Sequence, residues 1–390
     1  MLGLCLKIDK RGIYARNKME TEGILAFKQF YNFYLCRMVD KKNIRTLSFE
    51  ELNEYFTTIG EKKFRAKQVW EWLWQKHATR FEDMTNLSKE LRETLIDNFS
   101  LPSISINANQ YSTDGTVKTR FKTFDGHFVE GVLIPVDNRQ TACVSSQVGC
   151  SLSCKFCATG YMERKRNLHF DEIYDQVVLL DQMAEKTYGK KLSNIVFMGM
   201  GEPLLNYKNV LKAIERITAQ DGLAMSSRRI TVSTAGVAKM IRQLGDDGVK
   251  FNLAVSLHAA NDKKRNEIMP INESNNIKAL IEALNYFYDK TKNDITLEYI
   301  LFKGENDSFR DADDLIKIYK QVPVHLVNII EYNPIDNVSF VKPDKDATQK
   351  FMDYLAAHRV NVRLRISRGK DIDAACGQLA NKNLESAGLN

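Results

Sequence analysis

From residue 141 onward, the sequence alternates short apolar runs with helical patterns. The strand patterns are Thr141–Gln147, Asn194–Met200, Arg229–Thr234, Phe251–His258, Ile295–Leu301 and His325–Tyr332. Helical patterns between them include Val210–Ile217, Ile277–Tyr288 and Ala312–Tyr319. Because helices provide the crossovers that parallel strands need, this alternation predicts an α/β fold, a partial (β/α)6 barrel of the TIM type. A last helix at 347–358 and a last strand at 361–366 complete the predicted barrel domain, 141–380, ahead of a short tail, 381–390.

Composition sets the class of protein. The chain has 390 residues, of which 44% are hydrophobic and 27% charged, enough for one large core and a smaller module. Its seven cysteines are an odd number, which favours a reducing compartment over a disulfide scaffold. We find no apolar run of about 18 residues and no signal-peptide pattern, so we expect a cytoplasmic protein without a membrane span. The net charge of +7 is compatible with a polyanionic partner but does not identify one.

Three segments precede the barrel. Residues 1–37 show no clean period, and we interpret them as an extension outside the folded core or a misassigned start upstream of Met38; an ordinary N-terminal helix explains them equally well. Residues 38–105 read as a helical accessory domain, in which Ser48 and Glu51 have capping-box spacing.

The basic and tryptophan-rich face of this accessory domain could contact RNA. A core of Val69, Trp70 and Leu73 beneath solvated lysines explains the same pattern, and alone it is the better explanation. Residues 106–140 then predict a β-hairpin with Asp125-Gly126 at its turn. Glu130 lies on the return strand and could be a plain solvent-facing residue of that hairpin.

Three cysteines, Cys150, Cys154 and Cys157, form a Cys-x3-Cys-x2-Cys array between the strand pattern 141–147 and a helical pattern at 170–183. Thiolates are soft ligands that suit iron–sulfur clusters or zinc. A structural zinc site uses four protein ligands, and no fourth cysteine or histidine lies nearby in sequence. A 4Fe–4S cluster held by three cysteines leaves one iron open to a substrate. The array resembles that of radical S-adenosylmethionine (SAM) enzymes; a zinc loop with a distant fourth ligand is the alternative.

Candidate ligand-binding residues, most of them polar, lie at the predicted strand ends, where barrels bind their ligands. They are Gly201 and Glu202 after the second strand, Ser233 at the third, Ser256, Leu257 and His258 at the fourth, and Asn333 at the sixth. Glu202 could accept hydrogen bonds from an ammonium such as that of SAM. One such residue would be an ordinary loop cap, whereas four strand ends together predict a polar ligand.

Two further cysteines lie outside the array. Cys143 is in the strand leading to it, and Cys376 is in the small-residue segment Ala374–Gln378. A late lone cysteine is usually inert, but two spare thiols can form a transient disulfide pair, as attacking and resolving thiols do.

Taken together, these motifs resemble the RlmN/Cfr family of radical SAM RNA methyltransferases over roughly Leu47 to Ala380. The matching motifs are Cys143–Cys157, Gly199–Pro203, Ser256–His258, Tyr332–Pro334 and Asp371–Gln378. The resemblance implies that a 4Fe–4S cluster is ligated by Cys150, Cys154 and Cys157. It implies that SAM is contacted by Gly201, Glu202, Ser233, Ser256, Leu257, His258 and Asn333. It also implies that Cys376 carries a methyl group, that Cys143 resolves the protein–RNA link, and that Glu130 is the proton acceptor.

The family methylates adenine at C2 or at C8. The Ser256–Asp262 stretch and the Asp137–Arg139 approach to Cys143 resemble the C2 branch, which implies methylation of 23S rRNA and of the tRNA adenine 3′ of the anticodon, with two SAM per turnover. The resemblance also implies a low-potential electron donor such as flavodoxin or ferredoxin, and we expect a monomer. Alternatives are C8 methylation, a glycyl-radical activase that would not need Cys143 and Cys376, and a non-catalytic RNA-binding protein with a structural metal.

Overall fold

The computed structural model describes residues 41–382. The extension at 1–37 and the tail beyond residue 382 lie outside this range. The described chain divides into two compact units after Pro102, whereas the sequence placed the helical domain at 38–105. No helix within the described range is long and apolar enough to cross a membrane.

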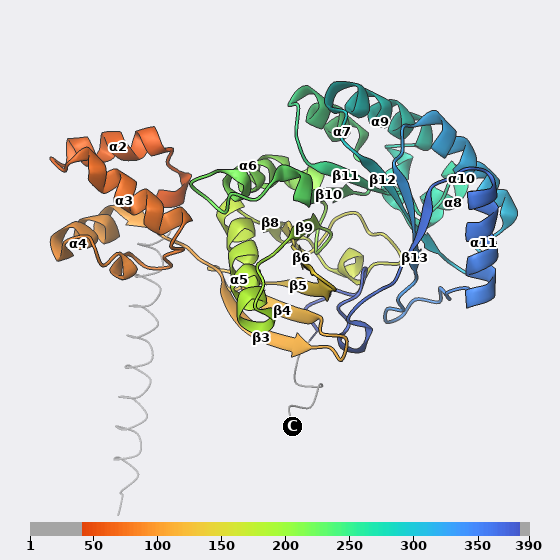
Figure 1. Cartoon of the computed structure of the whole chain (residues 1–390), viewed down its shortest axis with the longest axis horizontal. Coiled ribbons are helices and arrows are strands. Elements are labelled where there is room, and N and C mark those ends of the chain that lie inside the picture. The colour runs from red at the N-terminus through yellow and green to blue at the C-terminus, as the bar shows by residue number, and fades with distance from the viewer. Residues whose placement is uncertain (1–40, 383–390) are drawn as a thin grey trace, which may run out of the picture. The chain divides into compact units, whose positions relative to one another are not determined.

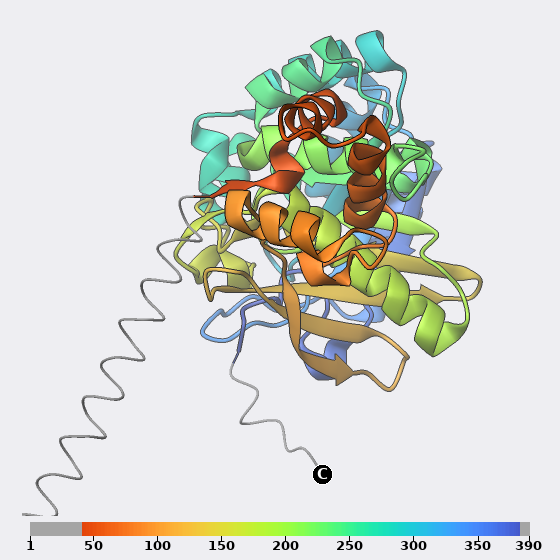
Figure 2. The ribbon, with the colours of Figure 1, turned by 90° about the vertical axis from the view of Figure 1, so that its left-hand side faces the viewer.

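The N-terminal unit is a small helical domain (Figure 2). Its elements are β1 (Lys42–Asn43), α2 (Phe49–Thr58), α3 (Lys63–Trp74), α4 (Lys89–Asn98) and β2 (Phe99–Ser100), with β1 and β2 paired in parallel. The predicted capping box starts α2: the Ser48 hydroxyl accepts from the Glu51 amide at 3.1 Å, and the Glu51 carboxylate accepts from the Ser48 amide at 2.7 Å. Two otherwise orphaned donors are thereby satisfied.

Helix α3 contributes four buried residues to this unit's core: Ala66, Val69, Leu73 and Trp74. Trp70 is half-buried, and its ring meets the Trp74 ring edge-to-face with the two centroids 5.8 Å apart. Lys62, Lys63 and Lys67 are exposed. These tryptophans thus contribute apolar burial to a small domain.

The second unit is built on a single ten-stranded sheet (Figure 1). Its strands are β3 (Ser105–Tyr111), β4 (Val117–Lys122), β5 (Phe128–Val136), β6 (Arg139–Cys143), β9 (Asn194–Phe197), β10 (Ile230–Thr234), β11 (Asn252–Ser256), β12 (Ile295–Leu301), β13 (Leu326–Glu331) and β14 (Val362–Arg365). Strands β6 and β9 to β14 pair in parallel in chain order, which confirms the predicted partial barrel.

Helices lie between the parallel strands and on the outer side of the sheet, as Figure 1 shows for α7, α9, α10 and α11. They are α5 (Phe170–Tyr188), α6 (Tyr207–Thr218), α7 (Ala238–Asp246), α8 (Asp262–Ile268), α9 (Ile277–Thr291), α10 (Phe309–Gln321) and α11 (Lys345–Ala357). The buried residues of α6 show why they pack: Val210, Ala213, Ile214 and Ile217 recur every three or four positions. One apolar stripe faces the sheet and the rest faces solvent.

The first barrel strand is shorter than the sequence predicted. β6 ends at Cys143, not at Gln147. The chain leaves the ladder there because Ser145 bonds elsewhere: its amide donates to the Gln176 side chain at 2.9 Å, and its hydroxyl donates to the Glu130 carbonyl at 2.5 Å. Gln147 belongs to β7 (Gln147–Val148), which pairs with β8 (Arg166–Asn167). This small pairing brackets the cysteine array.

The predicted hairpin is present and extends the barrel sheet, because β5 pairs antiparallel with β6. In the structure, other segments of the chain cover both faces of this hairpin. On one face α5 packs against β5 (Figure 2), and on the other the C-terminal segment binds Lys118 and Glu130. Glu130 is only 3% exposed, which rules out the alternative of a plain solvent-facing residue. The residues that bury the Glu130 carboxylate follow it by about 250 positions in the sequence.

Candidate active site

A cavity opens at the C-terminal ends of the parallel strands, inside the curve of the sheet. The residues predicted from the sequence that line it are Cys150, Cys154, Cys157, Gly201, Glu202, Ser233, Ser256, His258 and Cys376. They come from the array loop, from the ends of β9, β10 and β11, and from the C-terminal segment. The structure therefore gathers nine of the predicted site residues around one space.

Backbone contacts hold the array loop over the sheet. The Lys155 amide donates to the Ile268 carbonyl at 3.0 Å, and the Ala158 amide donates to the Gly377 carbonyl at 2.7 Å. Gly160 packs so tightly that a Cβ there would lie 2.7 Å from the Cys154 carbonyl oxygen. The second of these bonds fixes the C-terminal segment beside the array.

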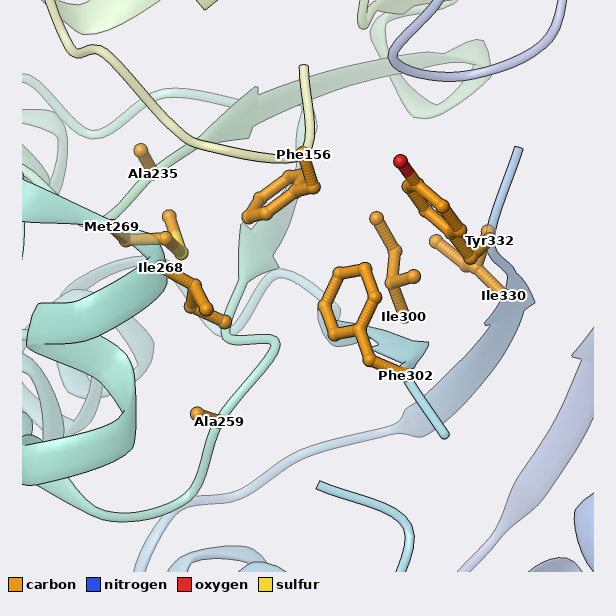
Figure 3. Close-up of a cluster of buried hydrophobic side chains, with 9 residues drawn as sticks. All are labelled: Phe156, Ala235, Ala259, Ile268, Met269, Ile300, Phe302, Ile330 and Tyr332. Atoms are coloured by element: carbon orange, nitrogen blue, oxygen red, sulfur yellow. The ribbon is translucent and has the colours of Figure 1, made fainter. Parts of the chain in front are cut away.

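Phe156 anchors the loop in a buried apolar cluster (Figure 3). Its ring meets His258 edge-to-face at 4.7 Å and lies 5.7 Å from the Phe302 ring, measured between centroids. Such aromatic pairs add about 1 kcal/mol beyond their burial. The apolar residue between two array cysteines thus fixes the loop to strand-end residues of the barrel.

The donor set fits an iron–sulfur cluster. Burial raises the pKa of the Cys150 thiol to about 11 and also raises that of Cys157, so metal would have to displace their protons. Within residues 41–382 no three acidic, histidine or cysteine side chains converge on one ion. A cubane does not require that convergence, because each cysteine ligates a different iron. Three soft sulfurs lining one cavity are the donors that such a cluster uses.

Glu202 is held rigidly beside the array. Its carboxylate accepts from the Leu204 amide at 3.0 Å and from the Ala235 amide at 2.8 Å. Burial raises the pKa of this carboxyl, and the two amide bonds oppose that rise. Gly201 precedes it at a φ of +92°, with a would-be Cβ 2.5 Å from the Gln147 side chain, so only glycine fits. Carboxylate oxygens retain lone pairs for an ammonium.

The other predicted SAM contacts divide into two groups. Ser233, Ser256 and His258 line the cavity. His258 accepts from the Ile300 amide through Nδ1 at 3.1 Å. Burial, aided by Arg265, lowers the pKa of His258 to about 3, so its imidazole is neutral and carries its proton on Nε2.

Leu257 and Asn333 lie behind the cavity lining. Leu257 is fully buried, and its carbonyl accepts from Arg265 at 3.1 Å. The Asn333 amide donates to the Cys376 carbonyl at 3.2 Å and to the Ser367 hydroxyl at 3.0 Å. Asn333 therefore positions the loop that carries Cys376.

Cys143 and Cys376 are both free thiols, the first buried and the second half-buried. Burial, and secondly the charge of Cys376, raise the pKa of Cys143 to about 12, while Arg365 opposes the rise. Cys376 lines the cavity, whereas Cys143 is the last residue of β6 and does not line it.

Glu130 does not line the cavity. Its carboxylate accepts from the amides of Ala380 at 2.9 Å and Asn381 at 3.2 Å, and it forms a 3.7 Å ion pair with Lys118. The segment that follows Cys376 therefore covers this carboxylate.

Two charged residues of the cavity were missed by the sequence reasoning. Glu298 lies in the middle of β12 and Arg365 ends β14, and both line the cavity. A charge inside the apolar run Ile295–Leu301 is the signal that would have pointed to Glu298. Arg365 has no comparable signal.

Arg166 binds the hairpin turn to the first barrel helix. Its guanidinium donates to the Asp125 carboxylate at 2.6 and 2.8 Å and to the Glu172 carboxylate at 2.6 and 2.8 Å. Burial raises the pKa of Asp125, but the hydrogen bonds from Arg166 and Thr123 outweigh burial and hold that pKa below its usual value. Arg166 is a structural link between these elements.

We expect Arg166→Met to lower the free energy of unfolding by about 3 kcal/mol near pH 7, because it strands the buried Glu172 carboxylate. Since the folded-state pKa of Asp125 is depressed, its contribution is complete above the unfolded pKa of about 3.9 and fades as the pH falls below it. Urea unfolding at pH 7 and pH 3 measures this. Lys165→Met, at the exposed neighbouring position, should change stability by less than about 0.5 kcal/mol at both pH values. A loss for Arg166→Met that persists unchanged at pH 3 would contradict the assignment.

Comparison with known proteins adds independent findings. Residues 42–101 match the family described as ribosomal RNA large subunit methyltransferase N-terminal domain, and residues 144–316 match the radical SAM superfamily. The chain is 57% identical over 358 residues to a probable dual-specificity RNA methyltransferase RlmN from Cytophaga hutchinsonii. This match covers 90% of this chain and 98% of the relative. It is 42% identical to the dual-specificity RNA methyltransferase RlmN of Geotalea uraniireducens, over 87% of this chain and 97% of the relative.

A solved structure is also similar along nearly its whole length. The crystal structure of a radical SAM methyltransferase from Sphaerobacter thermophilus superposes with a TM-score of 0.82 at 38% identity. The match covers 87% of this chain and 99% of that chain.

Proposed function

Because the chain belongs to the RlmN family of radical SAM RNA methyltransferases, we propose that it methylates C2 of a specific adenine in 23S rRNA and in tRNA, where the target is the adenine 3′ of the anticodon. Membership in the radical SAM superfamily implies SAM and a 4Fe–4S cluster as cofactors. The reaction proceeds through an S-methylcysteine on Cys376 and uses two SAM per turnover.

One observation carries this proposal: Cys376 lines the same cavity as the three cysteines of the array. A radical SAM enzyme of another class needs the array alone. A thiol beside it supports a reaction in which a methyl group rests on the protein. The bond between the Ala158 amide and the Gly377 carbonyl keeps the Cys376 loop beside the array.

The chemistry of the target base favours a radical route. C2 of adenine is an electron-poor ring carbon and does not attack a sulfonium methyl as a nucleophile. When bound, the cluster and SAM supply a one-electron route to a reactive carbon centre. In this proposal the cluster is held by Cys150, Cys154 and Cys157. SAM is oriented by Glu202, Ser233, Ser256 and His258.

Three residues handle the methyl group and its release. Cys376 carries the methyl group to the base, Glu130 accepts the proton that leaves C2, and Cys143 attacks the Cys376 sulfur to free the RNA. Because Ala380 and Asn381 occupy the Glu130 carboxylate, the C-terminal segment must shift before Glu130 acts. The base must also leave its stack, at a cost of a few kcal/mol, which favours loops as substrates. In this proposal the chain acts as a cytoplasmic monomer with a flavodoxin-type or ferredoxin-type electron donor.

The test is mass spectrometry of rRNA and tRNA digests from a strain that lacks the gene, with and without the gene restored. We expect 2-methyladenosine to disappear from both RNA classes in the deletion strain and to return on complementation. Complementation with a Cys376→Ala variant should fail. Loss of 8-methyladenosine instead would contradict the C2 assignment, and unchanged tRNA would restrict the substrate to rRNA.

A further inference from the structure

Lys118 is a buried cation to which the proposed reaction gives no role. It lies on β4 and is only 5% exposed, where an ammonium without partners would lose its hydration at a large cost in free energy. Its ammonium contacts the Glu130 carboxylate at 3.7 Å and donates to the Asp373 carbonyl at 3.3 Å. The first partner is the proposed proton acceptor, and the second lies three positions before Cys376. Lys118 therefore contacts both the base and the segment that carries the methyl group.

The pairing of Lys118 with Glu130 is built into the sheet. In the antiparallel ladder of β4 and β5, Arg120 lies directly opposite Glu130, and Lys118 is the diagonal neighbour on the same face (Figure 1). Arg120 is closer in register, but its guanidinium donates to the Asn107 side chain at 2.7 Å and to the Lys382 carbonyl at 3.4 Å. Among the described residues, the cation in ion-pair contact with Glu130 is therefore Lys118.

The Glu130 carboxylate has partners of two kinds. Ala380 and Asn381 donate their amides from the C-terminal segment, which must shift in the proposed reaction before Glu130 acts. Lys118 belongs to the same ladder as Glu130, so its ammonium stays beside the carboxylate when that segment moves. Burial favours the uncharged form of a carboxyl group, which cannot accept a proton, whereas a nearby cation favours the charged form. Lys118 is the partner that preserves the proton-accepting form once the two amides have left.

We propose that Lys118 is the positioning residue for Glu130, and that its ammonium keeps the carboxylate charged and in place while the C-terminal segment moves. The inference rests on the proposed function and deepens it. In the step concerned, the C2–H bond of adenine breaks, its electron pair stays in the ring, and the proton bonds to a Glu130 carboxylate oxygen. Lys118 keeps all its protons throughout and forms no bond to the substrate.

A deuterium label on the base measures the removal of the ring proton. The full chain is reconstituted anaerobically and reacted in a single turnover with transcripts of tRNA and of 23S rRNA. Each transcript is prepared with protium and with deuterium at C2 of adenine, and mass spectrometry of digests gives the rate at which 2-methyladenosine forms. The variants are Lys118→Met, Glu130→Gln and the two combined. Lys122→Met is the matched control, at the exposed end of the same strand.

We expect Lys118→Met to slow the formation of 2-methyladenosine about tenfold, and Glu130→Gln to slow it about a hundredfold, because a general base contributes at least that much. The deuterium isotope effect should be larger in Lys118→Met than in the unmodified chain, because removal of the ring proton becomes the slow step. Methylation of Cys376, measured on the protein without RNA, should be unchanged, since that step does not use Glu130. Lys122→Met should match the unmodified chain in all three measurements.

The combined variant controls for a folding defect. Lys118→Met alone leaves the buried Glu130 carboxylate without its cation, whereas the combination removes both charges together. If Lys118 acts through Glu130, the combined variant should be no slower than Glu130→Gln, because the two residues then act as one unit. Slowing by the product of the two single effects would overturn the proposal.

Two results for Lys118→Met would also overturn it. One is a rate equal to that of the unmodified chain. The other is a slower rate with an unchanged isotope effect, which would show that Lys118 supports the fold and not the proton transfer. Failure of the proposed function gives a different result, since the unmodified chain would then form no 2-methyladenosine in either transcript, and this inference would fail with it.

Discussion

Replacing Cys143 with alanine is expected to leave the protein covalently attached to its RNA. The variant should still methylate Cys376 and join the methyl carbon to adenine, because neither step uses the Cys143 sulfur. Release requires that sulfur: Cys143 loses its proton and forms a disulfide bond to Cys376, while the bond between the Cys376 sulfur and the bridging carbon breaks. That carbon keeps the bonding electron pair and takes up a proton, which leaves a methyl group on adenine. Without it the carbon stays bonded at both ends. Anaerobic reaction with labelled RNA, followed by denaturing electrophoresis, should show a shifted band of protein joined to RNA. Nearly every reaction event should end in this adduct.

Cys376→Ala is the matched control for this experiment. It should be equally inactive, but it should give no adduct, because no methyl group can be placed on the protein. Simple loss of packing would instead predict partial activity and no adduct in either variant. If Cys143→Ala shows no shifted band while it still cleaves SAM, the two-cysteine mechanism does not apply to this chain.

Loss of any one array cysteine should abolish both iron binding and reductive cleavage of SAM. We expect Cys154→Ala to bind less than about a tenth of the iron of the unmodified chain, because a cluster with two protein ligands is poorly retained. Iron and sulfide analysis, with the visible absorbance of the reconstituted protein, measures the first effect. Anaerobic assay of methionine and 5′-deoxyadenosine measures the second.

The Cys143→Ala protein provides the comparison for cluster loading. It removes a thiol that lies outside the array, and it should retain full iron content. Full SAM cleavage by Cys154→Ala would refute the assignment of Cys154 as a ligand. Equal iron loss in Cys143→Ala would instead show that the array is not the cluster site.

Much of the architecture follows from local patterns. The apolar period of α6 and the β-branched runs of the strands are each contained in one continuous segment of sequence. The same holds for the Ser48–Glu51 capping box and the Asp125-Gly126 turn. Strand ends were less certain, because a strand stops where competing hydrogen bonds begin. The end of β6 at Cys143 depends on the Gln176 side chain, 31 positions beyond Ser145.

The sequence by itself determined the barrel and the set of chemically competent residues: a cysteine array, two spare cysteines and polar strand ends. It did so because secondary-structure period and ligand spacing are local properties. Only the tertiary structure decided which of these residues share one cavity, that Asn333 supports the Cys376 loop rather than lining the cavity, and that Glu130 is buried. It alone brought Arg365 to Glu298. The physical reason is that burial and electrostatic contact depend on segments hundreds of residues apart, and no local pattern encodes which of them will meet.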